Sequence, residues 1–194
     1  MLRKKEVVYR NILERYFKGH ETRFTQLELS RRFGFSLSTV SNALAPLRSM
    51  GAITVKHNGF ELSDPKKALL YFATVRSLEK DIIYSTRLEA PPREIERLVP
   101  SGAVFTAYSA FRLIYKDAPA DYSEVYIYLP GSGLGEAKKR FPPSSRPPNI
   151  FVLEADPFIG KNAVSAPHLF ADLWNIRSWY AKEFLEALEM RLFP

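Results

Sequence analysis

The side chains best suited to chemistry in this chain form a small polar group between residues 38 and 42. They share a segment with apolar residues that repeat at helical spacing, which predicts a helix with one buried face. The apolar positions are Val40, Ala43, Leu44, Leu47 and Met50. Short hydroxyl and amide side chains on the opposite face can enter a major groove and hydrogen-bond to base edges, and asparagine can bind adenine through two hydrogen bonds. We therefore predict that DNA bases are contacted by Ser38, Thr39, Ser41 and Asn42.

Basic and polar side chains flank this group and suit a different contact. Phosphate oxygens accept hydrogen bonds from cationic, hydroxyl and amide groups, and these bonds position a protein on the duplex without reading its sequence. A pair of arginines beside a tight turn is well placed for such contacts. The predicted phosphate contacts are Arg31, Arg32, Ser36, Arg48, Lys56, His57 and Asn58.

Local signals predict the helices that would position these side chains. Thr25 can cap a first helix, and Gly34 can end it because glycine readily takes a positive φ. Ser36 can cap the second helix, and Gly51 can close it. Pro46 lies inside that second helix, so we expect a kink there, or a helix that ends early and restarts. In the first helix the side chains expected to face inward are Leu27, Leu29 and Phe33.

A hairpin is predicted directly after the second helix. Two short segments alternate apolar and polar residues, from Ile53 to Val55 and from Phe60 to Leu62, with Asn58-Gly59 between them as a strong turn signal. Helix, turn, helix and hairpin together are the build of a winged helix-turn-helix, in which the second helix reads DNA.

Charge is distributed unevenly along the chain. Residues 1–80 hold 15 Lys and Arg against 7 Asp and Glu, a balance of +8, whereas the total for all 194 residues is +7. The basic excess therefore belongs to the half that carries the predicted helix-turn-helix, which is typical of a nucleic-acid-binding domain.

Composition narrows the function classes. The chain has no cysteine, three histidines and no run of about 18 apolar residues, and no signal peptide opens it. We expect a cytoplasmic protein with no membrane contact, no metal site and no cofactor. The single glutamine and the absence of cysteine favour a thermophilic source.

The predicted fold class is α+β. Residues 1–64 are expected to form the winged helix-turn-helix domain, supported by a helix over residues 4–18. Residues 65–86 are expected to form a linker or dimerisation helix, continuous to about residue 84 and more apolar than one face requires. Strands alternate with helices in residues 87–194, which predicts an α/β sensor or interaction domain. We expect a homodimer.

Three further groups in the second half have residue types that could form a site. The glycines of segment 131–135 follow a strand, but their spacing fits no phosphate loop, so a flexible turn is preferred. Glu154 and Asp156 follow another strand, and turn formation before a proline is preferred for them. His168 and Asp172 stand four residues apart, and we expect a local surface pair.

The tail of the chain carries a resemblance to a known family. The segment VSAPHLFADLW from Val164 to Trp174, followed by AKEFLEAL over residues 181–188, is similar to a "V-S-P-x-x-A-x-x-D-L" stretch before a last helix. That pattern resembles the type IV antitoxin and transcriptional regulators of the abortive-infection AbiEi kind. The resemblance implies autoregulation, with a nucleotidyltransferase-type toxin or a small-molecule effector as partner.

The middle of the chain resembles a degenerate nucleotidyltransferase fold. Such enzymes carry a glycine pair at a helix start and a strand with alternate carboxylates that hold magnesium. Here Ala107-Tyr108 or Tyr108-Ser109 takes the place of the glycines, and Glu124 is followed two residues on by Tyr126. The resemblance implies a shared scaffold without the second acid, so we predict no catalytic residues.

We predict a sequence-specific regulator that binds double-stranded DNA. One alternative is a metal-dependent nucleotidyltransferase that uses Glu124 and Asp121 on magnesium. The other is a winged helix that binds protein.

Overall fold

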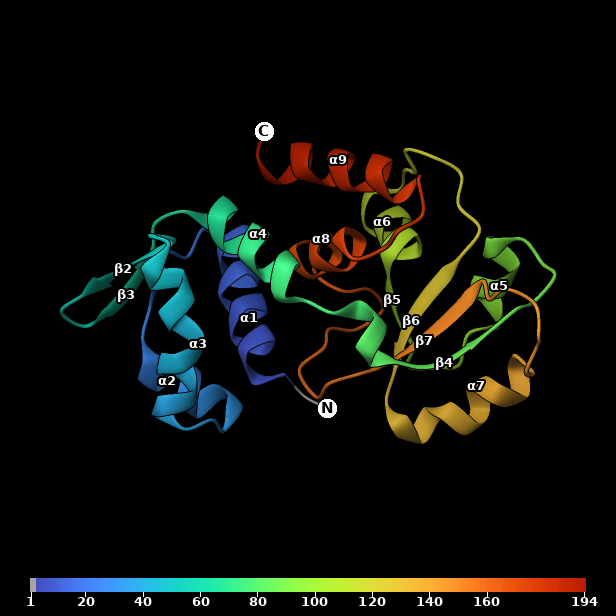
Figure 1. The fold of residues 1–194 in the computed structure, drawn as a ribbon, viewed down its shortest axis with the longest axis horizontal. Helices are drawn as coiled ribbons and strands as arrows, with labels where there is room; N and C mark the ends of the chain where they lie inside the picture. The colour runs from blue at the N-terminus through green and yellow to red at the C-terminus, as the bar shows by residue number, and fades with distance from the viewer. Residues whose placement is uncertain (1–2) are drawn as a thin grey trace.

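The computed structural model describes residues 3–194, and in it helices and two sheets form an α+β fold (Figure 1), as the sequence predicts. The N-terminal part has the element order of a winged helix-turn-helix. Its sheet is antiparallel in the order β1-β3-β2, with β1 an unforeseen short addition. The elements are α1 (Lys4–Gly19), β1 (Arg23–Phe24), α2 (Gln26–Phe33), α3 (Leu37–Ser49), β2 (Ile53–Lys56) and β3 (Gly59–Leu62).

The caps that set α2 and α3 are those predicted. Thr25 Oγ1 accepts a hydrogen bond from the Glu28 amide at 3.0 Å, and Ser36 Oγ accepts one from the Thr39 amide at 3.2 Å. Gly34 ends α2 at φ 65°. These side chains satisfy amides that have no partner within the helix, so both helix starts are fixed locally.

Two details of these helices differ from expectation. Leu27 was expected to face inward but is 46% exposed, because it lies two residues from buried Leu29 and so on the opposite face of α2. Of the two outcomes expected at Pro46, a kink or an early end, the early end is wrong, since α3 continues to Ser49. Pro46 removes one hydrogen bond to the preceding turn, but it keeps its own carbonyl, which accepts from the Met50 amide at 3.1 Å, so the last turn still forms.

A further difference concerns the segment after the hairpin. The helix α4 (Pro65–Val75) begins as predicted, with the Asp64 carboxylate accepting from the Lys67 amide at 2.8 Å. It does not run to residue 84. A 3-10 turn η1 (Leu78–Asp81) follows, and then strand β4 (Ile82–Thr86) pairs with a strand almost 70 residues further along the chain. That pairing is non-local, so the apolar periodicity of the segment did not reveal it.

The remaining elements form a mixed sheet in the order β4-β7-β6-β5, in which β6 and β7 are parallel and the other pairs are antiparallel. Helices lie on both faces of this sheet (Figure 1). The strands that follow β4 are β5 (Val104–Thr106), β6 (Val125–Leu129) and β7 (Ile150–Glu154). The helices are α5 (Pro92–Leu98), α6 (Ala107–Tyr115), the 3-10 turn η2 (Gly131–Gly133), α7 (Leu134–Arg140), α8 (Ala166–Trp174) and α9 (Ala181–Leu192).

Strand β6 divides its side chains between two layers. Val125, Ile127 and Leu129 belong to a small core with residues of α5 and α7. Tyr126 and Tyr128 face the other way, into a large core that also contains side chains of α6, α8 and α9. Period-two alternation in a strand has this consequence.

The large core continues without interruption into the N-terminal elements α1 to β3. Buried side chains from Val7 in α1 to Leu188 in α9 form one cluster, and α4 packs between α1 and α8. The apolar face of α4, formed by Ala68, Leu69, Phe72 and Ala73, is therefore buried within the chain against α1 and α8. The division into domains at residues 64 and 86 stays a prediction, because the two halves share this core.

Candidate nucleic-acid interface

Helix α3 presents one buried and one open face. Val40, Ala43, Leu44 and Leu47 are buried, as the helical spacing predicts, and Met50 is half-buried. On the open face Ser38, Asn42 and Arg48 are exposed, and Thr39 and Ser41 are half-buried. The structure thus brings the four predicted base-contacting residues to one side of one helix, and their contact with bases stays a prediction.

The hydroxyls at the start of α3 hold one another. Ser36 Oγ lies 2.9 Å from Ser38 Oγ and 2.9 Å from Thr39 Oγ1, while it also caps the helix. Asn42, one turn further on, makes no side-chain hydrogen bond with another described residue. Its amide has both a donor and an acceptor free for a partner.

The hairpin projects away from the rest of the molecule (Figure 1). Lys56 pairs with Gly59 across it, so the two turn residues are His57 and Asn58, and both are exposed. Gly59, expected in the turn, lies in β3 at φ 134°. A Cβ there would stand 2.2 Å from the carbonyl oxygen of Phe24, so glycine is required where β1 approaches.

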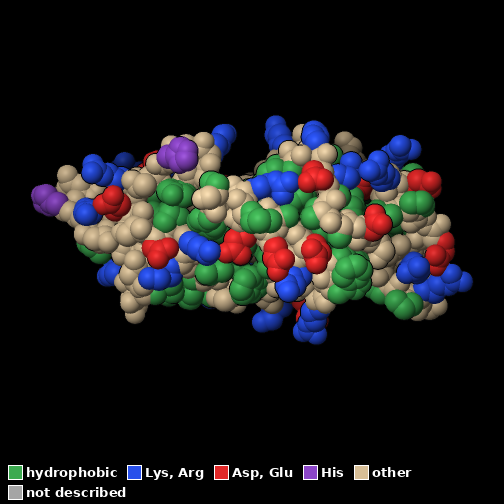
Figure 2. Space-filling view, turned by 90° about the horizontal axis from the view of Figure 1, so that it is seen from above, with side chains coloured by type: hydrophobic (Ala, Val, Ile, Leu, Met, Phe, Trp, Pro, Cys, Tyr) green, Lys and Arg blue, Asp and Glu red, His purple; other side chains and the backbone are tan. Residues whose placement is uncertain are grey.

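Cationic side chains surround this unit. Arg31, Arg32 and Arg48 are exposed, and the Arg32 guanidinium stacks over the Phe33 ring at 5.9 Å. Lys56 Nζ lies 3.1 Å from a Glu61 carboxylate oxygen, a half-exposed pair of the kind that contributes little and can exchange partners. Figure 2 shows Lys, Arg and His side chains over the end of the molecule that holds β2 and β3.

Exposed apolar side chains lie beside the polar ones, which the residue pattern does not predict. Leu37 is 50% exposed at the start of α3, and Val55 is 58% exposed on β2. Period-two alternation places Val55 on the same side as buried Ile53, but β2 is an edge strand of a small sheet and only Ile53 of it is buried.

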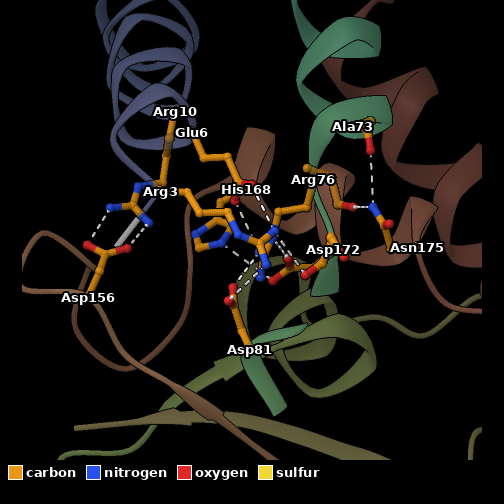
Figure 3. Close-up of polar contacts among 12 residues, drawn as sticks. Arg3, Glu6, Arg10, Ala73, Arg76, Asp81, Asp156, His168, Asp172 and Asn175 are labelled. Atoms are coloured by element: carbon orange, nitrogen blue, oxygen red, sulfur yellow. Dashed lines mark hydrogen bonds and ion pairs between the residues drawn. The ribbon is translucent and has the colours of Figure 1, made fainter. Parts of the chain in front are cut away.

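A segment that follows β7 ties the helix-turn-helix to the mixed sheet. Asp156 accepts two hydrogen bonds from Arg10 of α1, at 2.7 and 2.8 Å (Figure 3). The Phe158 ring packs edge-on against Phe33 of α2 at 4.9 Å between ring centroids. Asp156 also forms the predicted turn, accepting from the Phe158 amide at 2.8 Å. We call residues 155–162 the strap.

Next to the strap, a buried ionic network joins α1, α4, β6 and α8 (Figure 3). Arg76, at the end of α4, donates to Asp172 at 2.9 Å, to Glu6 at 3.1 Å and to the Tyr128 hydroxyl at 2.7 Å, and it also pairs with Asp81. Asp172 is fully buried, and its carboxylate accepts further hydrogen bonds from the hydroxyls of Thr106 and Tyr128, at 2.7 and 2.8 Å.

This network corrects the expectation of a surface pair. His168 and Asp172 are 4% and 0% exposed. Both face the core because α8 is covered by α1, α4, α6 and α9, so their four-residue spacing placed them on an inner face rather than an outer one. The partner that neutralises Asp172, Arg76, lies 96 residues away in the chain and gave no local signal.

Burial sets the protonation states here. Burial lowers the pKa of His168 to about 3, against the opposing charge of Asp172, so the imidazole is neutral near pH 7. Burial alone would raise the pKa of Asp172, but nearby cationic groups and hydrogen bonds hold it below its usual value. For Glu6, burial outweighs Arg76 and raises the pKa.

The position that would hold nucleotidyltransferase glycines has an unusual backbone. Ala107, the first residue of α6, has φ 51°, a left-handed conformation that favours glycine. Tyr108 behind it is fully buried among tyrosine and phenylalanine rings. Glu124 accepts hydrogen bonds from Ser178 and Tyr180, while Asp121 is exposed.

Within residues 3–194 no group of three His, Asp or Glu side chains is arranged to hold a metal ion. None of the helices in that range is both long and apolar enough to span a membrane. Comparison of the chain with protein-family models, with curated proteins and with solved structures finds no match.

Proposed function

We propose that this chain is a sequence-specific regulator of transcription that binds double-stranded DNA through α3 and the β2–β3 wing. The observation that carries the proposal is the open face of α3. It presents Ser38, Asn42 and Arg48 on a helix whose other face is locked into the core. Ser38 and Asn42 have short side chains, and Asn42 is free to bind a base edge.

The charge around this face supports the same proposal. Arg31, Arg32 and Arg48 are exposed cations, and the wing tip adds His57 and Asn58 beside Lys56. A recognition helix with phosphate-binding groups on both sides is the arrangement that lets a winged helix-turn-helix hold its register on a duplex.

The C-terminal half supports an antitoxin-like regulator of the AbiEi kind in one respect. The left-handed backbone at Ala107 lies where the related scaffold would carry glycine, and Glu124 is engaged by Ser178 and Tyr180. We propose that this half acts as a non-catalytic sensor or docking domain, with a nucleotidyltransferase-type toxin as its protein partner. Co-purification with such a toxin would test that partner.

The salt dependence of DNA binding tests the predicted phosphate contacts. If four to six phosphates are contacted, a log–log plot of affinity against salt should have a slope of roughly −4 to −5. The full chain is titrated with a duplex drawn from its own upstream region at several salt concentrations. A flat response would reject the proposal.

Paired substitutions distinguish base recognition from phosphate contact. Asn42→Ala should cost about 1–3 kcal/mol on the preferred duplex and little on a random one, whereas Lys56→Ala should weaken both alike. Lys139→Ala, on exposed α7 far from the wing, is the matched control and should change neither. Equal losses of Asn42→Ala on both duplexes would remove Asn42 from the base-reading set.

A second copy of the chain would favour a palindromic operator, with recognition helices about 34 Å apart or a multiple of that. The apolar face of α4 does not by itself require that copy, because α1 and α8 cover it within the chain. Light scattering at micromolar concentration, with and without duplex, measures whether the regulator binds as a dimer.

A further inference from the structure

A cavity of about 470 Å³ opens where the parallel strands β6 and β7 end. Pro130 follows β6 and Ala155 follows β7, and both line it, together with residues 102–104 at the start of β5 and much of the strap. The volume lies in the range of small-molecule sites, roughly 300–1,000 Å³. The carboxyl ends of parallel strands are also where sheets of this kind bind ligands.

The lining is mostly apolar. Alanine, valine, proline and isoleucine side chains and glycine backbone make up most of it: Gly102, Ala103, Val104, Pro130, Pro157 and Ile159. This separates the cavity from the smaller one of about 200 Å³ beside Arg76, whose ionic groups are already paired with one another. An occupant of the larger cavity must bring an apolar body.

Two ionised side chains border the cavity, and only one of them is compensated. The Asp156 carboxylate is held by both terminal nitrogens of Arg10 (Figure 3). Lys161 is exposed at the cavity and has no hydrogen bond from its ammonium and no ion pair with any residue in 3–194. An anion that enters the cavity could therefore pair with the Lys161 ammonium without breaking an existing ion pair.

We propose that this cavity binds a small apolar carboxylate, such as a medium-chain aliphatic acid. The hydrocarbon body lies against Ala103, Val104 and Ile159, and the carboxylate accepts a hydrogen bond from the Lys161 ammonium. A charge-assisted bond of this kind is stronger than a neutral one, and it sets the preference for an acid over an alcohol.

The wall of the cavity reaches the helix-turn-helix. The strap lines the cavity and also contacts the N-terminal helices. Its Asp156 accepts hydrogen bonds from Arg10 of α1, and its Phe158 ring packs against Phe33 and Phe35. Its far end is fixed to β5, where the Phe105 amide donates to the Asn162 carbonyl at 2.7 Å. An occupant that shifts the strap therefore changes the support of α2, and on the function proposed above it changes the affinity for DNA.

Calorimetric titration of the full chain with octanoate tests the site without DNA, and 1-octanol is the neutral comparison. We expect saturable binding of octanoate, weakened about tenfold or more by Lys161→Met, because a bond to a charged group is lost. Lys139→Met on α7 is the matched control and should leave the dissociation constant unchanged. For 1-octanol the Lys161→Met variant and the wild type should bind alike.

Location is tested by filling the cavity with Ala103→Phe, which should abolish octanoate binding while circular dichroism remains native. If that variant does not fold, amide chemical shifts of the wild type are followed instead, and Ala103, Gly160 and Lys161 should move on titration. No saturable binding, equal binding by Lys161→Met, or shifts confined to other residues would each overturn the proposal.

Measuring DNA affinity with and without octanoate distinguishes this inference from the proposed function. Octanoate binding with no DNA binding at all rejects the function and leaves the site standing. DNA binding with no octanoate binding rejects the site and leaves the function. Octanoate binding that leaves the DNA affinity unchanged rejects the link through the strap.

Discussion

Replacing Arg76 by methionine should be among the most damaging single changes in this protein. The side chain is 2% exposed and is the shared partner of Asp172, Glu6 and Asp81. Methionine keeps most of the apolar stem but leaves Asp172 fully buried without its cation. Removing one partner of a buried ion pair costs about 3–5 kcal/mol, because the remaining charge keeps its desolvation penalty.

A double-mutant cycle isolates that penalty. Asp172→Asn alone should cost less, about 1–3 kcal/mol, since Arg76 keeps two carboxylates and the Tyr128 hydroxyl. The double variant should be more stable than the sum of the single losses by about 2 kcal/mol, within the range for residues in direct contact. In the Arg76→Met variant the cost should shrink as the pH falls, because the unpaired carboxylate can bind a proton.

Urea unfolding, followed by circular dichroism, measures all four proteins. Arg140→Met is the control, because Arg140 pairs with Glu136 on the exposed face of α7 and surface pairs contribute about 0–1 kcal/mol. A loss below about 1 kcal/mol for Arg76→Met would refute the idea that this network holds the two halves together. Strict additivity in the cycle would refute the coupling between Arg76 and Asp172.

Three further outcomes are expected. His168 is neutral when folded, with a pKa of about 3 against 6.5 for an unperturbed group, so the unfolded chain binds the extra proton between those values and stability falls with falling pH. Wild type should lose about 2 kcal/mol from this group between pH 7 and 5 in urea titrations, and His168→Gln should lack that loss. Ala107→Gly should change the free energy of unfolding by no more than about 0.5 kcal/mol, because relief of the left-handed backbone offsets the loss of a buried methyl group. Ala110→Gly in the same helix should cost about 2 kcal/mol. Equal losses in thermal unfolding would contradict backbone strain at Ala107. Gly59→Ala should cost about 2–3 kcal/mol by thermal unfolding, because a Cβ meets the Phe24 carbonyl, while Gly19→Ala, which meets nothing within 4 Å, should be neutral or stabilising.

Features whose partners lie close together in the chain can be predicted from the amino-acid sequence. Thr25, Ser36 and Asp64 cap helices through amides only three residues away, and Gly34 ends α2 in the left-handed conformation that glycine tolerates. The stripe from Val40 to Leu47 is buried because helical spacing alone puts those side chains on one face. These are local rules, so the helix-turn-helix and the hairpin could be predicted.

Features that depend on distant partners, such as the buried polar groups, follow from how the elements pack. Segment 82–86 has the apolar character of a helix or a strand, and the presence of β7 beside it made it a strand. His168 and Asp172 carry the same spacing whether α8 lies on the surface or inside, and four neighbouring helices placed them inside. Arg76 meets Asp172 across 96 residues, and Lys161 lines a cavity built from three separate segments. Contacts of this length depend on how the elements pack, and the residue types near each partner carry no record of that packing.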